Sequence, residues 1–113
     1  MTTAVEGVWK FDFLGGHGWE TVGTLVLVGG RVGGGSATHC TTGTYEALGD
    51  AVTMHTVVQF YGTHKPFFGS KASRIPVTLE GTLNGDTIRG TEFSPEARAH
   101  SYDYRLIKQH DMT

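Results

Sequence analysis

Apolar and polar residues alternate with a period of two along most of this chain, and no other sequence feature constrains its fold as strongly. The clearest example is the segment 52–60, where Val52, Met54, Val58 and Phe60 share one face of an extended chain. Such alternation predicts a β-strand with one buried face. The sequence shows no convincing long helix. We therefore expect an all-β protein.

Glycine-containing turns separate the alternating segments. Glycine supplies 17 of the 113 residues, where a share of about 7% is usual, and its dispersed placement is typical of tight turns rather than of a linker. Gly29-Gly30, Gly49-Asp50 and Asn84-Gly85-Asp86 are hairpin-turn signals. This spacing predicts consecutive hairpins made of about eight short strands. The longest connection, residues 62–73, breaks the alternation.

A sheet of about eight short strands has to bury one face and protect its edge strands. Closing the sheet on itself does both, so we expect residues 1–113 to form one domain, a small antiparallel up-and-down barrel. A small β-sandwich is the alternative. Eight-stranded barrels lie at the boundary between an interior filled by side chains and one that holds a small ligand. The large rings of Trp9, Phe11, Phe13 and Tyr104 favour a filled interior.

Charge and composition argue against several classes of partner. The formal net charge is −2 and no basic run is present, whereas nucleic-acid binding usually leaves a basic stripe in the sequence. Residues 1–6 lack the basic start and apolar core of a signal peptide. No apolar stretch approaches the roughly 20 residues that cross a bilayer. We therefore expect a cytoplasmic protein that binds neither nucleic acid nor membrane.

The sequence offers no recognisable catalytic or metal-binding motif. Its six histidines lack the short spacings of zinc ligands. The glycine cluster 29–36 has neither the lysine nor the following helix of a phosphate-binding loop. His39 and Cys40 are adjacent, so in a strand their side chains would point to opposite faces. We expect no metal, no cofactor and no enzymatic activity.

The long connection carries one candidate binding surface. It places Phe67 and Phe68 among the cations Lys65 and Lys71. Conspicuous side chains in a loop on a rigid scaffold often serve recognition, so Lys65, Phe67 and Phe68 are predicted to bind a protein partner. The alternative is that one or both phenylalanines plug the open end of the barrel.

A second candidate surface is the segment Leu25-Val26-Leu27-Val28, which is apolar on both faces. In a sheet with one solvated face, such a strand predicts an exposed patch that a partner covers. A symmetric homodimer is the simplest cover, and Val26 and Val28 would form its interface. A local helix or loop over this strand is the alternative.

Gly7-Val8-Trp9, at the start of the first strand, is similar to the Gly-x-Trp signature of lipocalin-like (calycin) barrels. This resemblance implies that Trp9 packs at the closed end of a barrel against a basic residue from the last strand, for which Arg105 is the candidate. It also implies a second type of function, the binding of a small hydrophobic ligand. Such a ligand would lie in the barrel mouth against Trp9, Phe11, Met54 and Tyr104.

A longer pattern resembles the GrlR-like family, named for a negative regulator of type III secretion. The matching residues are Gly7-x-Trp9, Gly29-Gly30-Arg31-Val32-x-Gly34-Gly35, Gly43-x-Tyr45, Gly49-Asp50-x-Val52, Phe68-Gly69 and Leu79-x-Gly81-Thr82-Leu83-x-Gly85-Asp86-x-Ile88-x-Gly90. This resemblance implies a dimeric barrel that represses by sequestering a transcription activator. Glu46 and Asp50 occupy the hairpin position where the family's regulator carries an acidic cluster.

Two hypotheses of function follow. The favoured one is a non-catalytic dimeric regulator that covers a protein partner through the Glu46–Asp50 hairpin or the Phe67-Phe68 loop. The alternative is a barrel that binds a small hydrophobic ligand in its interior.

Overall fold

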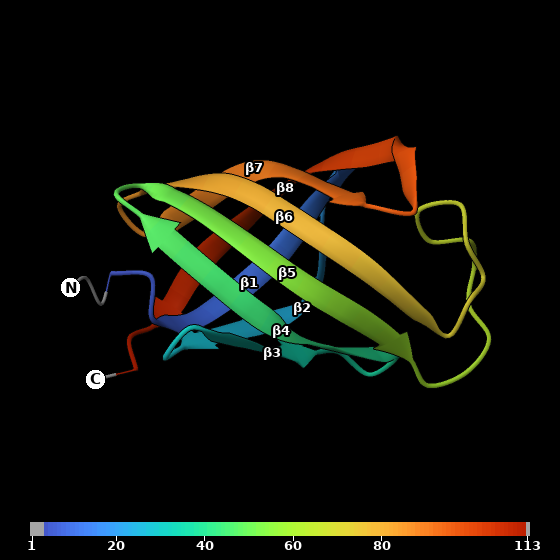
Figure 1. The fold of residues 1–113 in the computed structure, drawn as a ribbon, viewed down its shortest axis with the longest axis horizontal. Helices are drawn as coiled ribbons and strands as arrows, with labels where there is room; N and C mark the ends of the chain where they lie inside the picture. Colours follow the sequence, from blue (N-terminus) through green and yellow to red (C-terminus); the bar gives the residue numbers. More distant parts are fainter. Residues whose placement is uncertain (1–3, 113) are drawn as a thin grey trace.

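The computed structural model of this protein describes residues 4–112, without the side chain of Arg98, and shows a closed barrel of eight antiparallel strands in sequence order (Figure 1). The strands are β1 (Gly7–Gly15), β2 (Gly18–Val28), β3 (Arg31–Gly35), β4 (His39–Leu48), β5 (Ala51–Phe60), β6 (Arg74–Asn84), β7 (Thr87–Ser94) and β8 (Ala97–His110). The predicted all-β, up-and-down barrel is confirmed, and the sandwich alternative is wrong. The pairing of β1 with β8 closes the sheet, with Phe11 opposite Leu106 and Phe13 opposite Tyr104.

The two ends of the barrel differ. One end, which we call the terminal end, carries both chain termini and the tight turns at Gly29-Gly30, Gly49-Asp50 and Gly85-Asp86 (Figure 1). The glycines at positions 29, 30, 49 and 85 have positive φ angles between 59° and 81°, as hairpin turns of this length require. The other end, the loop end, carries residues 61–73 between β5 and β6 and residues 36–38 between β3 and β4.

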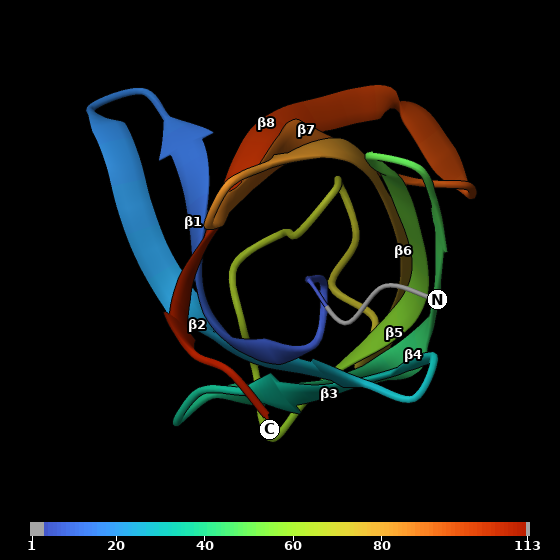
Figure 2. The ribbon, with the colours of Figure 1, turned by 90° about the vertical axis from the view of Figure 1, so that its left-hand side faces the viewer.

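Trp9 closes the terminal end. Its side chain is 0% exposed, and its Nε1 donates a 3.0 Å hydrogen bond to the carbonyl oxygen of Val5. The short segment before β1 lies inside the outline of the barrel when this end is viewed directly (Figure 2). The Lys108 ammonium lies 5.2 Å from the centroid of the Trp9 ring and donates a 2.7 Å hydrogen bond to the carbonyl oxygen of Ala4.

The basic residue over Trp9 is therefore Lys108 and not Arg105, the candidate that the sequence suggested. The reason is the period of two in β8. Tyr104, Leu106 and Lys108 share the inner face of the barrel, whereas Arg105 points outward and pairs with Asp12 at 2.8 Å. Alternation along a strand thus decides which cation meets the tryptophan.

Large side chains fill the terminal half of the barrel. The fully buried members of this core include Trp9, Leu27, Met54, Ile88, Tyr104 and Leu106. The Tyr104 hydroxyl lies directly over Gly81 on β6, where a Cβ atom would clash with it. Glycine at this position lets a full tyrosine ring lie across the interior. The expectation of a filled interior is correct for this half of the barrel.

Candidate ligand-binding cavity

The loop half of the barrel is hollow. It encloses a cavity of about 570 Å³, which is within the range of roughly 300–1,000 Å³ typical of small-molecule sites. The lining residues are Phe11, Phe13, Thr21, Val22, Leu25, Ser36, Ala37, Thr38, His39, Thr41, Thr56, Val58, Phe60, Pro66, Phe67, Val77, Leu79, Glu92 and Tyr102. The expectation of a filled interior is wrong for this half.

The size of the inward-facing residues explains why the loop half is hollow and the terminal half is filled. In the loop half, β4, β5 and β6 present small side chains to the interior, among them Thr41, Thr56, Val58 and Val77. The Thr56 hydroxyl donates a 2.8 Å hydrogen bond to the carbonyl oxygen of Val77, so it needs no partner inside the cavity. Short side chains on three adjacent strands cannot reach the barrel axis, and the space between them and the opposite wall stays open.

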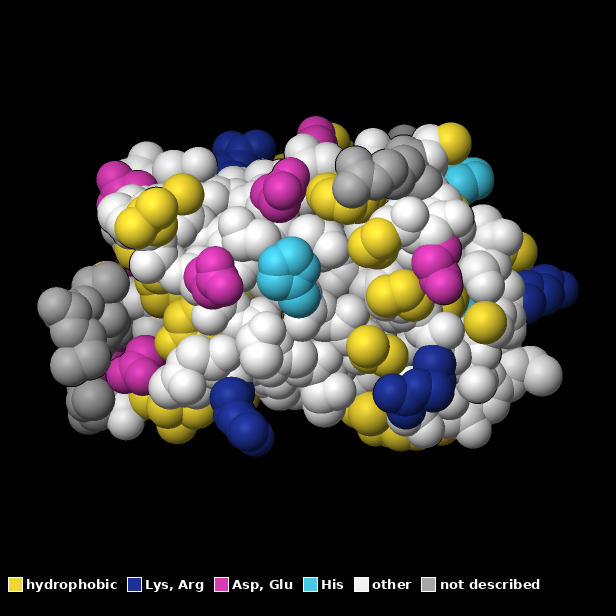
Figure 3. Space-filling view, in the orientation of Figure 1, with side chains coloured by type: hydrophobic (Ala, Val, Ile, Leu, Met, Phe, Trp, Pro, Cys, Tyr) yellow, Lys and Arg dark blue, Asp and Glu magenta, His cyan; other side chains and the backbone are white. Residues whose placement is uncertain are grey.

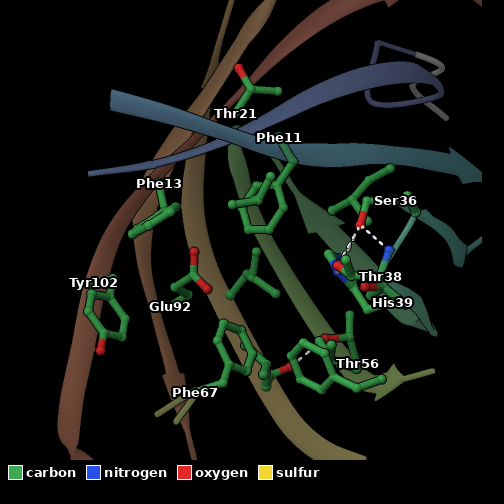
Figure 4. A pocket seen from close by; sticks show the side chains of 18 of the residues that line it. Phe11, Phe13, Thr21, Ser36, Thr38, His39, Thr56, Phe67, Glu92 and Tyr102 are labelled. Atoms are coloured by element: carbon green, nitrogen blue, oxygen red, sulfur yellow. Dashed lines mark hydrogen bonds between the residues drawn. The ribbon is translucent and has the colours of Figure 1, made fainter. Parts of the chain in front are cut away.

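Aromatic rings form the opposite wall. Phe11 and Phe13 come from β1, and Tyr102 comes from β8 (Figure 4). Phe13 and Tyr102 meet edge to face with 6.1 Å between ring centroids, and Phe11 meets Tyr104 in the same way at 6.1 Å. Edge-to-face pairs of this kind fix ring positions, so this wall is preformed.

The loop of residues 61–73 lies across the loop end (Figure 1). Its tip is a tight turn in which Phe67 and Ser70 exchange two backbone hydrogen bonds of 2.8 and 3.0 Å. Phe68, inside this turn, has a φ of 51°, a conformation that costs a non-glycine residue on the order of 1–3 kcal/mol. Its ring is 1% exposed and packs 5.1 Å from the ring of Tyr102. Burial of the ring offsets the strained backbone.

His64 fixes the base of this loop. Its ring stacks on Phe60 with 3.7 Å between centroids. Its Nδ1 lies 2.6 Å from the carbonyl oxygen of Lys65, and its Nε2 lies 2.8 Å from that of Ala72. The His64 ring therefore lies between the two sides of the connection, and its N–H donates to one of these two carbonyl oxygens.

Glu92, on β7, is the one carboxyl group among the lining residues. It is 3% exposed, and its Oε2 has no hydrogen-bond partner among the described residues. Its side chain points into the cavity between the rings of Phe13, Tyr102 and Phe67 (Figure 4). Burial raises the pKa of Glu92 to about 8, because the apolar surroundings disfavour the charged form. The carboxyl group is therefore mostly protonated at neutral pH.

A second buried carboxyl group, that of Asp12, shows what Glu92 lacks. Asp12 is 1% exposed and accepts 2.8 Å hydrogen bonds from Arg105 and Thr21, with Lys10 at 3.5 Å. Its own desolvation acts to raise the pKa of Asp12, but the hydrogen bonds and the two cations lower it overall. Asp12 is thus a fully paired structural carboxylate, whereas Glu92 is buried without a partner.

His39, on β4, provides the other polar region of the cavity. Its Nδ1 lies 3.0 Å from the Ser36 hydroxyl and 3.2 Å from that of Thr38, and these three residues form one side of the lining (Figure 4). Burial lowers the pKa of His39, because the partly apolar surroundings disfavour the charged ring. The Nδ1 atom of His39 thus has hydrogen-bond partners among its neighbours, whereas the Oε2 atom of Glu92 has none among the described residues.

The residues predicted for small-ligand binding are divided between the two halves. Phe11 lines the cavity. Trp9, Met54 and Tyr104 are 0% exposed and belong to the filled terminal half. Sequence reasoning missed Glu92, although the signal was present. Ile88 is buried, and Glu92 follows it by four residues, so a period of two puts both on the inner face.

The residues predicted for partner binding lie at opposite ends of the barrel. Glu46 and Asp50 are exposed on the hairpin of β4 and β5 at the terminal end, and Lys65 is exposed at the loop end. Phe68 is buried as a plug, which was the alternative left open by the sequence, and Phe67 lines the cavity. The structure does not bring the hairpin and the loop together as one surface.

Val26 and Val28, predicted to form a dimer interface, lie on the outer face of β2. Leu25 and Leu27 point inward and are buried, whereas Val26 is half-buried and Val28 is 42% exposed. This arrangement is the alternation expected for a strand that is apolar on both faces. The dimer itself stays a prediction.

Within residues 4–112, no group of three or more His, Cys, Asp or Glu side chains is placed to hold a metal ion. The same part of the chain contains no helix that is long and apolar enough to cross a membrane.

Comparison of the sequence with models of known protein families gives no match, and no curated protein matches it. The architecture is consistent with a lipocalin-like barrel because it is closed, eight-stranded and antiparallel. The resemblance to the GrlR-like family has no support from these comparisons. The regulatory role and the protein partner that it implies are therefore proposals.

Glu92 should make the stability of the protein depend on pH. Its pKa is 4.5 in an ordinary setting and about 8 in the folded protein, so between these values the folded state holds a proton that the unfolded chain releases. The free energy of unfolding should therefore fall with rising pH across this window, by about 1.4 kcal/mol per pH unit at most. Glu92→Gln should remove this fall and unfold at a higher urea concentration than the wild type at pH 8.

The exposed Glu80→Gln variant on β6 is the matched control and should keep the pH dependence of the wild type. A Glu92→Gln variant that is less stable than the wild type at pH 8 would show that the carboxylate has a partner.

Phe68 offers a direct check of the plug. Phe68→Ala should lower the free energy of unfolding by about 3 kcal/mol, because it removes a buried aromatic ring. Phe68→Gly removes the same ring but suits the left-handed backbone, and should be more stable than Phe68→Ala by about 1 kcal/mol. Urea denaturation of both variants measures the difference. If both variants are as stable as the wild type, the Phe68 ring is not buried in solution.

Proposed function

We propose that this protein is a non-catalytic binder of a small, largely apolar molecule, which it holds in the cavity of the loop half. The observation that carries the proposal is the combination of a preformed cavity of about 570 Å³ with a buried carboxyl group in its lining, Glu92, whose Oε2 has no hydrogen-bond partner among the described residues. Small-molecule sites are commonly concave, mostly apolar and equipped with a few polar groups that orient the ligand.

The contrast between the two halves of the barrel supports this proposal. The terminal half is packed by Trp9, Met54 and Tyr104 to full burial, as protein interiors usually are. The loop half keeps small residues on three strands and a buried carboxyl group that lowers stability at neutral pH. Destabilising features of this kind are typical of a site that gains its missing contacts from a ligand.

Filling the cavity tests this function. Wild-type protein should bind the uncharged dye Nile red saturably, with a rise in dye fluorescence. Val58→Phe places a ring into the cavity from β5 and should weaken this binding at least tenfold. Val57→Phe adds the same ring to the adjacent position, which lies on the outer face of β5, and should leave binding unchanged. Absence of saturable binding to the wild type, or equal binding by Val58→Phe, would overturn the proposal.

As a second candidate, we propose a homodimeric regulator that covers a protein partner with its terminal end. The observation that favours it is Leu48, which is 85% exposed between Glu46 and Asp50 on the β4–β5 hairpin. On the face formed by β4, β5 and β6, however, apolar side chains are scattered rather than gathered in one broad patch (Figure 3).

The oligomeric state tests this second candidate. Size-exclusion chromatography with light scattering should give the mass of a dimer, and Val28→Lys at the exposed edge of β2 should convert it to a monomer. A monomeric wild type at micromolar concentration would remove the dimer on which this candidate depends.

A further inference from the structure

The charges around the cavity restrict the chemistry of its ligand. None of the lining residues is Lys or Arg, and their only ionisable side chains are Glu92, His39 and Tyr102. Burial lowers the pKa of His39, which disfavours the charged form of its ring. An anionic ligand such as a fatty acid would therefore enter a cavity whose lining, among the described side chains, contains no Lys or Arg and holds a carboxyl group.

Lys65 and Lys71, on the loop that covers this end of the barrel, are exposed to solvent and are not among the residues that line the cavity. Arg105 and Lys10 pair with Asp12 on the outer face, and Lys108 pairs with Asp111 beside Trp9 at the terminal end. Among the described side chains, none donates a hydrogen bond to Glu92, and the Tyr104 hydroxyl, whose pKa is raised by burial and by the Glu92 charge, is likewise buried without a partner. A molecule that enters the cavity can supply the partner that Glu92 lacks.

The surroundings of Glu92 favour a cationic partner over a neutral one. Its carboxyl group lies between the rings of Phe13, Tyr102 and Phe67 (Figure 4). A cation held there would gain a charge-assisted hydrogen bond, which is about twice as strong as a neutral one. It would also lie against aromatic rings, whose faces attract positive charge. A neutral alcohol or carbonyl group would gain only the weaker hydrogen bond.

Resting on the proposed function, we infer that the ligand of this cavity is an amine with an apolar body, and that its ammonium group donates a hydrogen bond to the Glu92 carboxylate. The apolar body lies against the small residues of β4, β5 and β6, such as Thr56, Val58 and Val77. Glu92 therefore determines specificity, and the remainder of the cavity supplies apolar contact.

Pairing between the ammonium group and Glu92 should make the affinity for the amine depend on pH. Tyr102 lines the cavity beside Glu92, the Tyr104 hydroxyl is affected by the Glu92 charge, His39 lies on the far side of the cavity, and Glu80 on β6 is exposed (Figure 4). In the empty protein the pKa of Glu92 is raised to about 8, and a free alkylamine is protonated at this pH. The ion pair holds one proton fewer than the separate partners, so binding releases a proton. Amine affinity should rise up to tenfold per pH unit towards pH 8 and then level off.

Three probes of equal length test the inference: octylamine, octanol and octanoate, measured by calorimetry at pH 8 with wild-type protein, Glu92→Gln and Glu80→Gln. The wild type should bind octylamine at least tenfold more tightly than octanol, and octanoate most weakly. Glu92→Gln should lose the preference for the amine while keeping its affinity for octanol. Glu80→Gln, an exposed carboxylate on the neighbouring strand, should behave like the wild type.

The outcomes separate this inference from the proposed function. If octanol binds the wild type as tightly as octylamine, or if Glu92→Gln retains the preference, the amine assignment is wrong and the apolar binding site stands. If neither Nile red nor any of the three probes binds the wild type, both proposals fail. The comparison among probes uses wild-type protein alone, so it does not depend on the folding of a variant.

Discussion

The pairing of β1 with β8 is the constraint on which the rest of this structure depends. It joins strands from the two ends of the chain, with Phe11 opposite Leu106, and it removes both edges of the sheet. Closure also defines an inside, where inward-facing residues of every strand must share a limited space. Trp9, held by Val5 and covered by Lys108, then seals one end of that space.

The size of the inward-facing residues decides what each half of the interior does. Tyr104 reaches across the terminal half because Gly81 leaves room for its hydroxyl, and the side chains of Trp9, Met54 and Tyr104 are fully buried there. In the loop half, small residues such as Thr56 leave a space that Phe67 and Phe68 cover without filling. One closed sheet thus combines a stable core with an open cavity, and the buried Glu92 lies in the cavity.

The sequence predicts the fold well because its signals are local. Alternation and two-residue glycine turns, such as Gly85-Asp86, depend on neighbouring residues only, and both are borne out in the structure. The cavity depends on how side chains from distant strands meet across the interior. No local pattern shows that Trp9 and Met54 pack in the filled half, or that Phe68 folds inward. The period of two along β7 predicts that Glu92 faces inward. Its burial and its lack of a hydrogen-bond partner become visible only in the closed barrel.

The most direct test of this account is heteronuclear NMR mapping of octylamine binding to the intact protein. Saturable shift changes are expected at backbone amides of cavity residues such as Thr56, Val58 and Glu92, with little change at Leu48 and Val28. Changes centred on Leu48 or Val28, or no saturable change at all, would contradict the claim that the loop half of the barrel is a ligand-binding site.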